Sequence, residues 1–292
     1  MNTVKGRVAI VTGGGQGMGR ETALLLGKEG AKVVVCDIAK SKEQPDKYCA
    51  DLVAEQIRAE GGEAIACNAD LSIFETGKKL VDEAVKAYGT IDIVCMVAGA
   101  QKVQPVDELD EATWNKLMAI NCTTMFSLVH YAAPIMKEKG YGRIVCYASR
   151  AAFGNGKSAI YSASKGGVMG FAAELGYELT PFGIHTNCIL PSAVTGLFPN
   201  SKVAYDGTPK PDPEGPDMVA PMTVYLCSEA CEQSGEFFYV SGCDVGLYPR
   251  NRLPVGLIRK GNKEKWTVEE LSTMVPETFD WYFATKQKTS TR

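Results

Sequence analysis

Short apolar segments alternate with longer amphipathic segments along most of the chain. Apolar, β-branched runs occur at 8–11, 32–36, 64–67, 91–97, 143–147, 185–190 and 237–240. The stretches between them are long enough for crossover helices, as in the amphipathic segment 21–29. Strands with little polar alternation are expected where helices cover both faces of a parallel sheet. The pattern predicts an α/β, Rossmann-like doubly wound parallel sheet of seven strands with helices on both faces.

Length and charge narrow the class of protein. The chain has 292 residues, 45% of them hydrophobic and 22% charged, which suits one large domain. We expect this domain at 1–248 and an extension at 249–292. A net charge of −3 gives no broad basic surface for nucleic acid or an anionic membrane. The first residues lack a signal-peptide layout, and no apolar run is long enough to span a bilayer. We therefore expect no nucleic-acid or membrane partner and a cytoplasmic location.

The ten cysteines are expected to be reduced. Five of them, Cys36, Cys67, Cys95, Cys146 and Cys188, fall inside apolar runs, where cysteine behaves as a small buried hydrophobe. Cys227 and Cys231 are four residues apart on an expected helix and are also assigned to core packing. The chain has no CxxC, and both histidines lie far from any cysteine pair at zinc-ligand spacing. We predict no metal site.

A glycine-rich turn, Thr-Gly-Gly-Gly-Gln-Gly-Met-Gly at 12–19, follows the first predicted strand. Between a strand and a helix, such a turn lets backbone amides approach a pyrophosphate at the helix N-terminus. Asp37 ends the second predicted strand, where an acid accepts hydrogen bonds from a ribose 2′-hydroxyl and repels a 2′-phosphate. Neither Gln16 nor Ile38 supplies the cation that an NADP site needs, so NAD is the expected cofactor. Asp70, after the third strand, is either an adenine-edge contact or a helix N-cap.

Tyr161 and Lys165 are four residues apart and share one face of a predicted helix. An ammonium beside a phenol stabilises the phenolate, so we expect Lys165 to lower the pKa of Tyr161 toward neutral pH, where a general acid or base works best. Ser149, at the end of the fifth predicted strand, would orient and polarise the same substrate oxygen. A Tyr-x-x-x-Lys spacing alone also arises on solvated helix faces.

The full set of motifs resembles the short-chain dehydrogenase/reductase family over roughly the first 245 residues. The resemblance rests on the glycine turn, Asp37, Asp70-Leu71, Ala98-Gly99, Asn121, Ser149, Tyr161-x-x-x-Lys165, and Pro191 with Thr195. It implies that Asn121 holds a water in a proton relay with Lys165, that Lys165 binds the nicotinamide ribose, and that Thr195 contacts the carboxamide. The catalytic residues are then Asn121, Ser149, Tyr161 and Lys165. The cofactor residues are Gly13, Gln16, Gly17, Met18, Gly19, Asp37, Asp70, Leu71, Ala98, Gly99, Tyr161, Lys165, Pro191, Val194 and Thr195.

Three features depart from the family pattern. The Asn-Asn-Ala-Gly of the family is here Met96-Val97-Ala98-Gly99, so apolar packing is expected to replace polar contacts at the sheet centre. Pro191-Ser192 stands in place of Pro-Gly, and the interval from Ser149 to Tyr161 is one residue shorter than the commonest family spacing. The last two changes lie at the active-site rim and affect substrate placement more than hydride transfer, because the acid/base and cofactor residues are present.

A narrower resemblance, to the dehydrogenase domain of peroxisomal multifunctional enzymes, is carried by 46–66, 141–145 and 220–232. It implies (3R)-hydroxyacyl-CoA as a substrate, and in some members steroid 17-hydroxyls. The segment 195–221 contains six prolines and is expected to be a substrate lid, or else a plain surface loop. Its acids outnumber its lysines, which disfavours a CoA phosphate site. We therefore favour a hydrophobic ring substrate such as a hydroxysteroid, with (3R)-hydroxyacyl-CoA and a catalytically silent nucleotide-binding scaffold as alternatives.

The extension 249–292 begins with several basic residues and continues with a capping-box pattern at Thr267 and Glu270. The extension also contains five large aromatics: Trp266, Phe279, Trp281, Tyr282 and Phe283. So many aromatics favour packing on the same subunit or a neighbour. A basic partner-binding tail is the alternative. The family resemblance implies a homotetramer or homodimer.

Overall fold

A computed structural model gives the structure of the chain and describes residues 3–154, 156, 158–197, 215–248, 274 and 277. The chain divides into two compact units, Met1–Tyr248 and Pro249–Arg292. The first unit carries one sheet in the order β3-β2-β1-β4-β5-β6-β7-β8. Its strands are β1 (Val8–Thr12), β2 (Lys32–Cys36), β3 (Glu63–Cys67), β4 (Ile93–Met96), β5 (Gly142–Tyr147), β6 (Ile184–Pro191), β7 (Phe237–Ser241) and β8 (Asp244–Tyr248).

Helices connect successive parallel strands. They are α1 (Gly17–Lys28), α2 (Cys49–Ala59), α3 (Thr76–Tyr88), α4 (Glu111–Met118), α5 (Thr124–Lys139), α6 (Ala159–Glu178) and α7 (Ala220–Cys227), with a π-helical turn η1 (Ala119–Thr123) between α4 and α5. Short 3₁₀ turns are η2 (Arg150–Phe153), η3 (Thr180–Phe182) and η4 (Pro216–Met218). The expected helix at 21–29 corresponds to α1, which begins four residues earlier, directly on the glycine turn.

The predicted doubly wound sheet is confirmed, and seven of its strands lie at the expected places. The prediction missed β8, which pairs antiparallel with β7 from Phe237↔Tyr248 to Ser241↔Asp244. A two-residue turn joins the two strands, with Gly242 at a φ of 55°, and a connection this short can only make a hairpin. Val245 and Leu247 of β8 are exposed at 59% and 58%.

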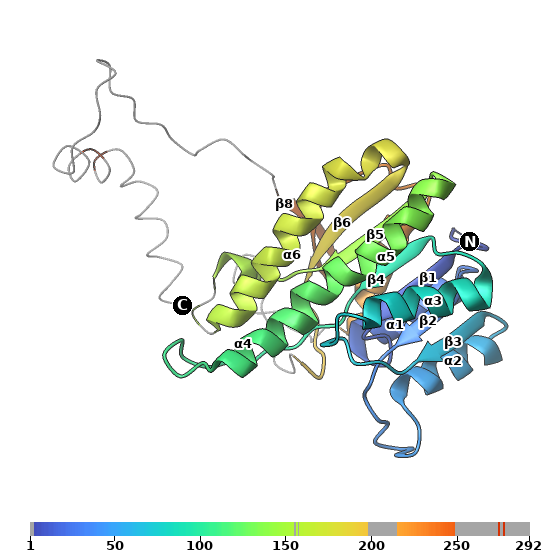
Figure 1. Ribbon diagram of the computed structural model, residues 1–292, viewed down its shortest axis with the longest axis horizontal. Coiled ribbons are helices and arrows are strands. Elements are labelled where there is room, and N and C mark those ends of the chain that lie inside the picture. Colours follow the sequence, from blue (N-terminus) through green and yellow to red (C-terminus); the bar gives the residue numbers. More distant parts are fainter. Residues whose placement is uncertain are drawn as a thin grey trace. The chain divides into compact units, whose positions relative to one another are not determined.

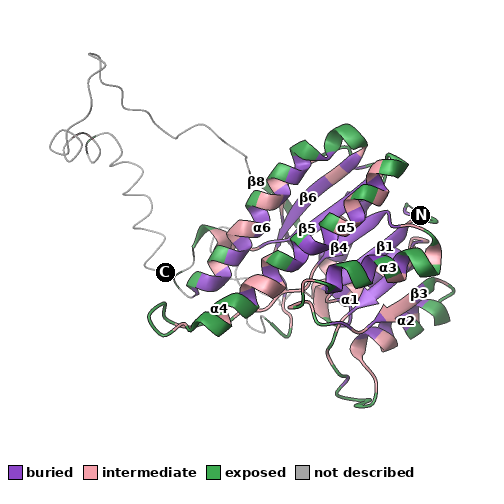
Figure 2. Cartoon of the chain, viewed as in Figure 1, coloured by how far each residue is buried: buried purple, intermediate pink, exposed green. Residues whose placement is uncertain are grey.

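The parallel strands contribute alternate side chains to two separate hydrophobic layers. Ile10, Val34 and Ile144 pack with α3, α5 and α6 on one face. Val11 and Val35 pack with α1, α2 and α7 on the other. Figure 1 shows α3, α5 and α6 lying across one face of the sheet, and Figure 2 shows strands buried along most of their length beneath helices with exposed outer surfaces.

The cysteines expected in the core lie there: the five strand cysteines are buried, together with Cys227 and Cys231. All ten cysteines have free thiols in the structure. The Sγ atoms of Cys95 and Cys227 lie 3.5 Å apart between the sheet and α7. The expectation of one helix for Cys227 and Cys231 is wrong, because α7 ends at Cys227 and Cys231 packs from the loop beyond it.

The strand order reverses at β1, which pairs with β2 on one side and β4 on the other. Such a switch point leaves a crevice at the carboxyl ends of the strands, where ligands of doubly wound proteins bind. Within the described residues, no helix is long and apolar enough to cross a membrane. Most of the expected lid (198–214), the expected capping box and the five tail aromatics lie outside the described residues.

Candidate active site

A cavity of about 770 Å³ opens at the carboxyl ends of the strands. Its walls come from the loops that follow β1 to β6, together with Tyr161 and Lys165 of α6. It therefore brings together most of the residues predicted for the cofactor and for catalysis. Among the predicted cofactor residues, only Val194 does not line it, and among the predicted catalytic residues, only Asn121 does not.

The glycine turn is packed too closely for side chains. A Cβ on Gly19 would lie 2.0 Å from the carbonyl oxygen of Gly13, and a Cβ on Gly13 would lie 2.9 Å from Cα of Ala98. Gly13 and Gly17 also adopt φ values of 64° and 51°, which side chains disfavour. The chain therefore reaches the N-terminus of α1 as bare backbone. A pyrophosphate group fits this cradle, because amide N–H groups and the helix dipole both face an anion there.

Two carboxylates stand at this end of the cavity. Asp37 accepts hydrogen bonds from the backbone N–H groups of Gly15 (3.1 Å) and Ala39 (2.8 Å), so it is fixed beside the glycine turn. Asp70 accepts one from the N–H of Ser72 at 2.8 Å, which lowers the pKa of its carboxyl. The alternative of Asp70 as a helix N-cap is wrong, since α3 begins six residues later at Thr76.

The loop after β4 lies across the cavity from these carboxylates. The N–H of Ala98 donates to the hydroxyl of Thr12 at 3.3 Å, and Met96 is buried in the core. Apolar packing and one threonine therefore hold the sheet centre, as expected from the sequence. Farther out, Gln101 donates to the carbonyl of Leu197 at 3.1 Å and joins this loop to the one after β6.

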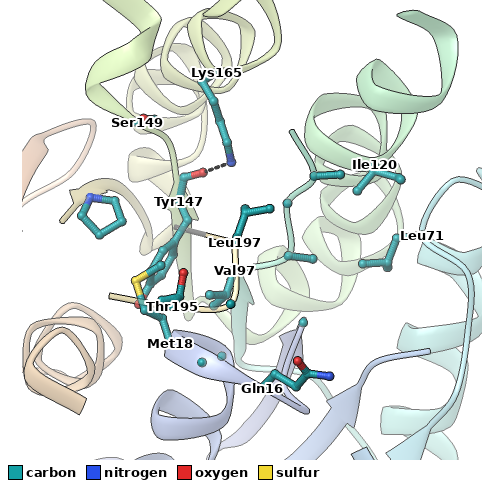
Figure 3. A pocket seen from close by; sticks show the side chains of 18 of the residues that line it. Gln16, Met18, Leu71, Val97, Ile120, Tyr147, Ser149, Lys165, Thr195 and Leu197 are labelled. Atoms are coloured by element: carbon teal, nitrogen blue, oxygen red, sulfur yellow. Dashed lines mark hydrogen bonds between the residues drawn. The ribbon is translucent and has the colours of Figure 1, made fainter. Parts of the chain in front are cut away.

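The catalytic end is formed by β5 and α6. Ser149 lies two residues beyond the end of β5 and caps η2, accepting a hydrogen bond from the N–H of Ala151 at 3.2 Å. Tyr161 and Lys165 are buried on α6, with exposures of 5% and 3%. The Nζ of Lys165 donates to the carbonyl oxygen of Tyr147 at 2.6 Å and lies 5.8 Å from the ring centre of Tyr161. Figure 3 shows the side chain of Lys165 extending from α6 to the backbone of Tyr147, and it shows Ser149 on the segment that follows β5.

Burial dominates the electrostatics of this pair. It raises the pKa of Tyr161 to about 12, while a hydrogen bond with Ser149 lowers it to a smaller extent. It also lowers the pKa of Lys165 to about 8. The expectation that Lys165 brings the pKa of Tyr161 toward neutrality is wrong for this structure, because the ammonium is bound to Tyr147 and desolvation of the phenolate prevails. The phenol of Tyr161 is therefore protonated at neutral pH.

Asn121 lies in the π-helical turn η1 between α4 and α5. Its Oδ1 accepts from the N–H of Ala100 at 2.8 Å, and its Nδ2 donates to the carbonyl of Ala100 and to Oγ of Ser164, both at 2.9 Å. Ser164 in turn donates to the carbonyl of Tyr161 at 3.0 Å. The side chain of Asn121 thus joins the loop after β4 to the catalytic helix, and π-helical turns of this kind often mark functional sites.

Sequence reasoning missed further residues that line the cavity, among them Ile120, Tyr147, Arg150 and Leu197. Arg150 is the one that carries charge. Its position immediately after Ser149 was a signal that could have identified it. No group of three or more His, Cys, Asp or Glu in the described parts of the chain could hold a metal ion. The predicted absence of a metal site remains a prediction.

Comparisons with known proteins identify the family. The family model for the short chain dehydrogenase matches residues 7–202. The peroxisomal multifunctional enzyme type 2 of Drosophila melanogaster is 34% identical over 239 residues, which are 80% of this chain and 38% of that protein. A subunit of (2S)-[(R)-hydroxy(phenyl)methyl]succinyl-CoA dehydrogenase of Thauera aromatica is 32% identical over 191 residues, 65% of this chain and 74% of that one.

The fold agrees with these matches. The crystal structure of a short chain dehydrogenase from Mycobacterium avium superposes with a TM-score of 0.82 at 29% identity, covering 95% of this chain and 96% of that one. The chain spans about two fifths of the length of the Drosophila relative. Members of the family are oxidoreductases that act on CH–OH groups and typically use NAD or NADP. The predicted family is thus confirmed, and the chain belongs to the short-chain dehydrogenases.

Proposed function

We propose that the protein is an NAD-dependent dehydrogenase that interconverts a 3-hydroxyacyl thioester and the 3-oxoacyl thioester. The observation that carries this proposal is that one cavity is lined both by Ser149, Tyr161 and Lys165 and by the glycine turn, where we expect a dinucleotide to bind. The thioester class is supported by the relatives, because the Thauera protein is named for a hydroxyacyl-CoA substrate. This replaces the hydroxysteroid favoured from the sequence, which rested on the acidic character of a loop whose greater part, 198–214, lies outside the described residues.

Preference for NAD rests on the charges around Asp37. This carboxylate would accept hydrogen bonds from a ribose 2′-hydroxyl and repel a 2′-phosphate. Its neighbours on the cavity wall, Ile38 and Ala39, carry no charge. In the described part of the lining, the basic residues are Lys165 and Arg150, which belong to the catalytic end. We expect the double variant Asp37→Ser/Ile38→Arg to favour NADP, and Ile38→Arg alone to retain NAD preference.

The residues of the chain then divide the proton chemistry between them. Ser149 donates a hydrogen bond to the substrate oxygen and holds it beside the phenol of Tyr161. In reduction, Tyr161 gives its proton to the forming alcohol, which its raised pKa favours. In oxidation, the phenol must first release its proton to solvent, and the phenolate then takes the hydroxyl proton of the substrate. Lys165 would stabilise the phenolate when its ammonium turns from Tyr147 toward it. Bound in the cradle, NAD would supply the hydride acceptor.

A second candidate substrate is a secondary alcohol on a hydrophobic ring. Leu197 lines the cavity and Phe153 is 63% exposed near its catalytic end. These side chains offer apolar contact to a bulky neutral group. A nucleotide-binding scaffold without activity is disfavoured because Ser149, Tyr161 and Lys165 share one cavity wall.

The test is NADH formation by the purified protein. The panel contains both enantiomers of 3-hydroxybutyryl-CoA, longer 3-hydroxyacyl-CoA thioesters, hydroxysteroids and simple cyclic alcohols, each with NAD and with NADP. Turnover of one thioester enantiomer with NAD, abolished in Tyr161→Phe, supports the proposal. Turnover of steroids alone moves the assignment to the ring substrate. Tight NADH binding without any turnover supports the scaffold, and preference for NADP contradicts the role of Asp37.

Compartment, assembly and domain boundary are separate proposals. The chain was expected in the cytoplasm, whereas the Drosophila relative is named as peroxisomal, and fluorescence microscopy of the protein tagged at an internal loop would distinguish these locations. We propose a homodimer or homotetramer whose dehydrogenase domain ends near residue 248. Deletion of 249–292, followed by sedimentation and thermal unfolding, tests whether the extension packs on the domain. Unchanged assembly and stability would contradict packing.

A further inference from the structure

Arg150 places a second positive charge at the catalytic end of the cavity. It directly follows Ser149, begins η2, is half-buried and lines the cavity. Lys165, the other base in the described lining, is buried and bound to the carbonyl of Tyr147. The acids of that lining, Asp37 and Asp70, follow β2 and β3 at the opposite end. The two ends of the cavity therefore carry opposite charge, and the positive end is where the substrate reacts.

An aromatic cluster holds Arg150 in place. Its guanidinium carbon lies 5.5 Å from the ring centre of Tyr239 on β7. Tyr239 meets Tyr248 of β8 edge to face at 6.5 Å, and Tyr248 packs on Phe153 at 5.6 Å. Arg150 and Phe153 are the first and last residues of η2, so one short turn contacts the β7–β8 hairpin at both ends.

This arrangement is compatible with pairing to an anion. A guanidinium contacts an aromatic ring through its face, whereas its five N–H donors lie in its plane. Ring contact limits the orientations of the side chain and lowers the entropy lost when an oxyanion pairs with it. Burial in the cavity wall also strengthens such a pair relative to one at a fully exposed site.

We propose that Arg150 is a substrate-binding residue that pairs with an oxyanion carried by the thioester substrate. This rests on the proposed thioester dehydrogenase function. The oxyanion has two sources: a carboxylate on the acyl group, or a phosphate of the CoA carrier. Both present a pair of oxygens that arginine binds with two parallel hydrogen bonds.

A purely structural role makes a different prediction. If Arg150 only anchors the Ser149 turn to the hairpin, its loss lowers activity equally for charged and neutral substrates. If it binds an oxyanion, the loss depends on substrate charge and falls mainly on KM. The two roles are therefore separated by substrates that differ only in charge.

The experiment uses three thioesters of the reactive enantiomer. These are 3-hydroxybutyryl-CoA, the N-acetylcysteamine thioester of 3-hydroxybutyrate, which has no phosphate, and an N-acetylcysteamine thioester whose acyl group carries an additional carboxylate. Arg150→Met removes the positive charge, whereas Arg150→Lys keeps the charge but lacks the paired N–H donors of the guanidinium. Lys86→Met removes an exposed charge on α3 and serves as the control. NADH binding and thermal unfolding show that each variant is folded.

We expect Arg150→Met to lower kcat/KM about 10- to 100-fold for the anionic thioester that Arg150 binds, through KM, and less than about threefold for the neutral one. Arg150→Lys should recover part of this loss, and Lys86→Met should show none. The anionic thioester that is affected identifies the source of the oxyanion. Equal losses on all three thioesters, or no loss on any, overturn the proposal for Arg150. Absence of thioester turnover by the wild type would instead refute the proposed function.

Discussion

At the end of the cavity proposed for the dinucleotide (the dinucleotide end), one short stretch of chain supplies much of the lining, whereas the catalytic end draws its residues from several distant elements. Residues 13–19 and Asp37 belong to a single β1–α1–β2 unit, in which the glycines present backbone and Asp37 presents its carboxylate. Ser149, Lys165 and Asn121 come from separate parts of the chain, and Tyr239 of the β7–β8 hairpin contacts Arg150. The first end depends on close backbone approach, and the second on buried side chains held by tertiary contacts.

The same contrast holds for electrostatics. Asp37 is tied to two backbone N–H groups beside the glycine turn. Tyr161 and Lys165 are buried, and burial opposes the charged form of each. The dinucleotide end is thus built to hold a ligand in place, whereas the catalytic end holds groups whose protonation can change. Substitutions should therefore separate binding from turnover.

The largest separation is expected for Tyr161→Phe. Removal of the phenol hydroxyl takes away the general acid, which contributes about 10²- to 10⁴-fold to the rate, and leaves the glycine turn intact. Turnover should fall by that factor, while NADH affinity, measured by fluorescence titration, changes less than about threefold. Tyr177→Phe, at an exposed position on the same helix, is the matched control. A large loss of NADH affinity in Tyr161→Phe would show that the two ends are not independent.

Gly19→Ala should give the converse result. The new Cβ would overlap the carbonyl of Gly13, so the turn must shift where the pyrophosphate is expected. We expect NADH affinity to fall roughly 100-fold or more. Gly170→Ala is the matched control, because it adds a Cβ to helix α6 with nothing within 4 Å and should stabilise the fold by about 1 kcal/mol. Wild-type NADH binding by Gly19→Ala would remove the glycine turn from the cofactor site.

The difference between the two ends also explains what could be predicted from the sequence. The glycine turn and Asp37 follow strands with a clear apolar pattern, so local sequence is enough to place them in one crevice. The positions of Tyr161 and Lys165 were equally visible, but the direction of their pKa shifts depends on desolvation by residues far away in the chain. Tyr239 lies on β7 beside β8, and β8 is too exposed to give a strong strand pattern.

The buried ammonium should leave a measurable dependence of stability on pH. Burial lowers the pKa of Lys165 from 10.5 to about 8 in the folded chain, so the unfolded chain binds more protons between these two values. Stability contributed by this group therefore rises with pH across pH 8 to 10.5, by roughly 3 kcal/mol. Lys165→Met lacks this titration.

Urea unfolding of both proteins without cofactor at several pH values measures the difference. The free energy of unfolding of Lys165→Met, minus that of the wild type, should be larger at pH 7.5 than at pH 10. This difference should shrink steadily as the pH rises between these values. A constant gap over this range would show that Lys165 titrates normally and that the catalytic end is better solvated than its burial indicates.

The smallest expected effect tests how the two ends are joined. Tyr147 uses its backbone carbonyl to hold Lys165, while its hydroxyl pairs with Thr223 at 2.5 Å and approaches Thr22 of α1 at 3.4 Å. Tyr147→Phe removes the hydroxyl and keeps the carbonyl. We expect a stability loss of about 1 kcal/mol and unchanged turnover.

Thr223→Val and the double variant complete a mutant cycle that isolates the pair. A coupling energy near 1 kcal/mol with normal kcat would show that the Tyr147 hydroxyl only stabilises the packing of α7 on β5. A fall in kcat of tenfold or more in Tyr147→Phe would instead show that the hydrogen bond with Thr223 also positions the backbone carbonyl of Tyr147, and thus Lys165. The dinucleotide and catalytic ends would then be coupled through a residue that contacts both α1 and the lysine.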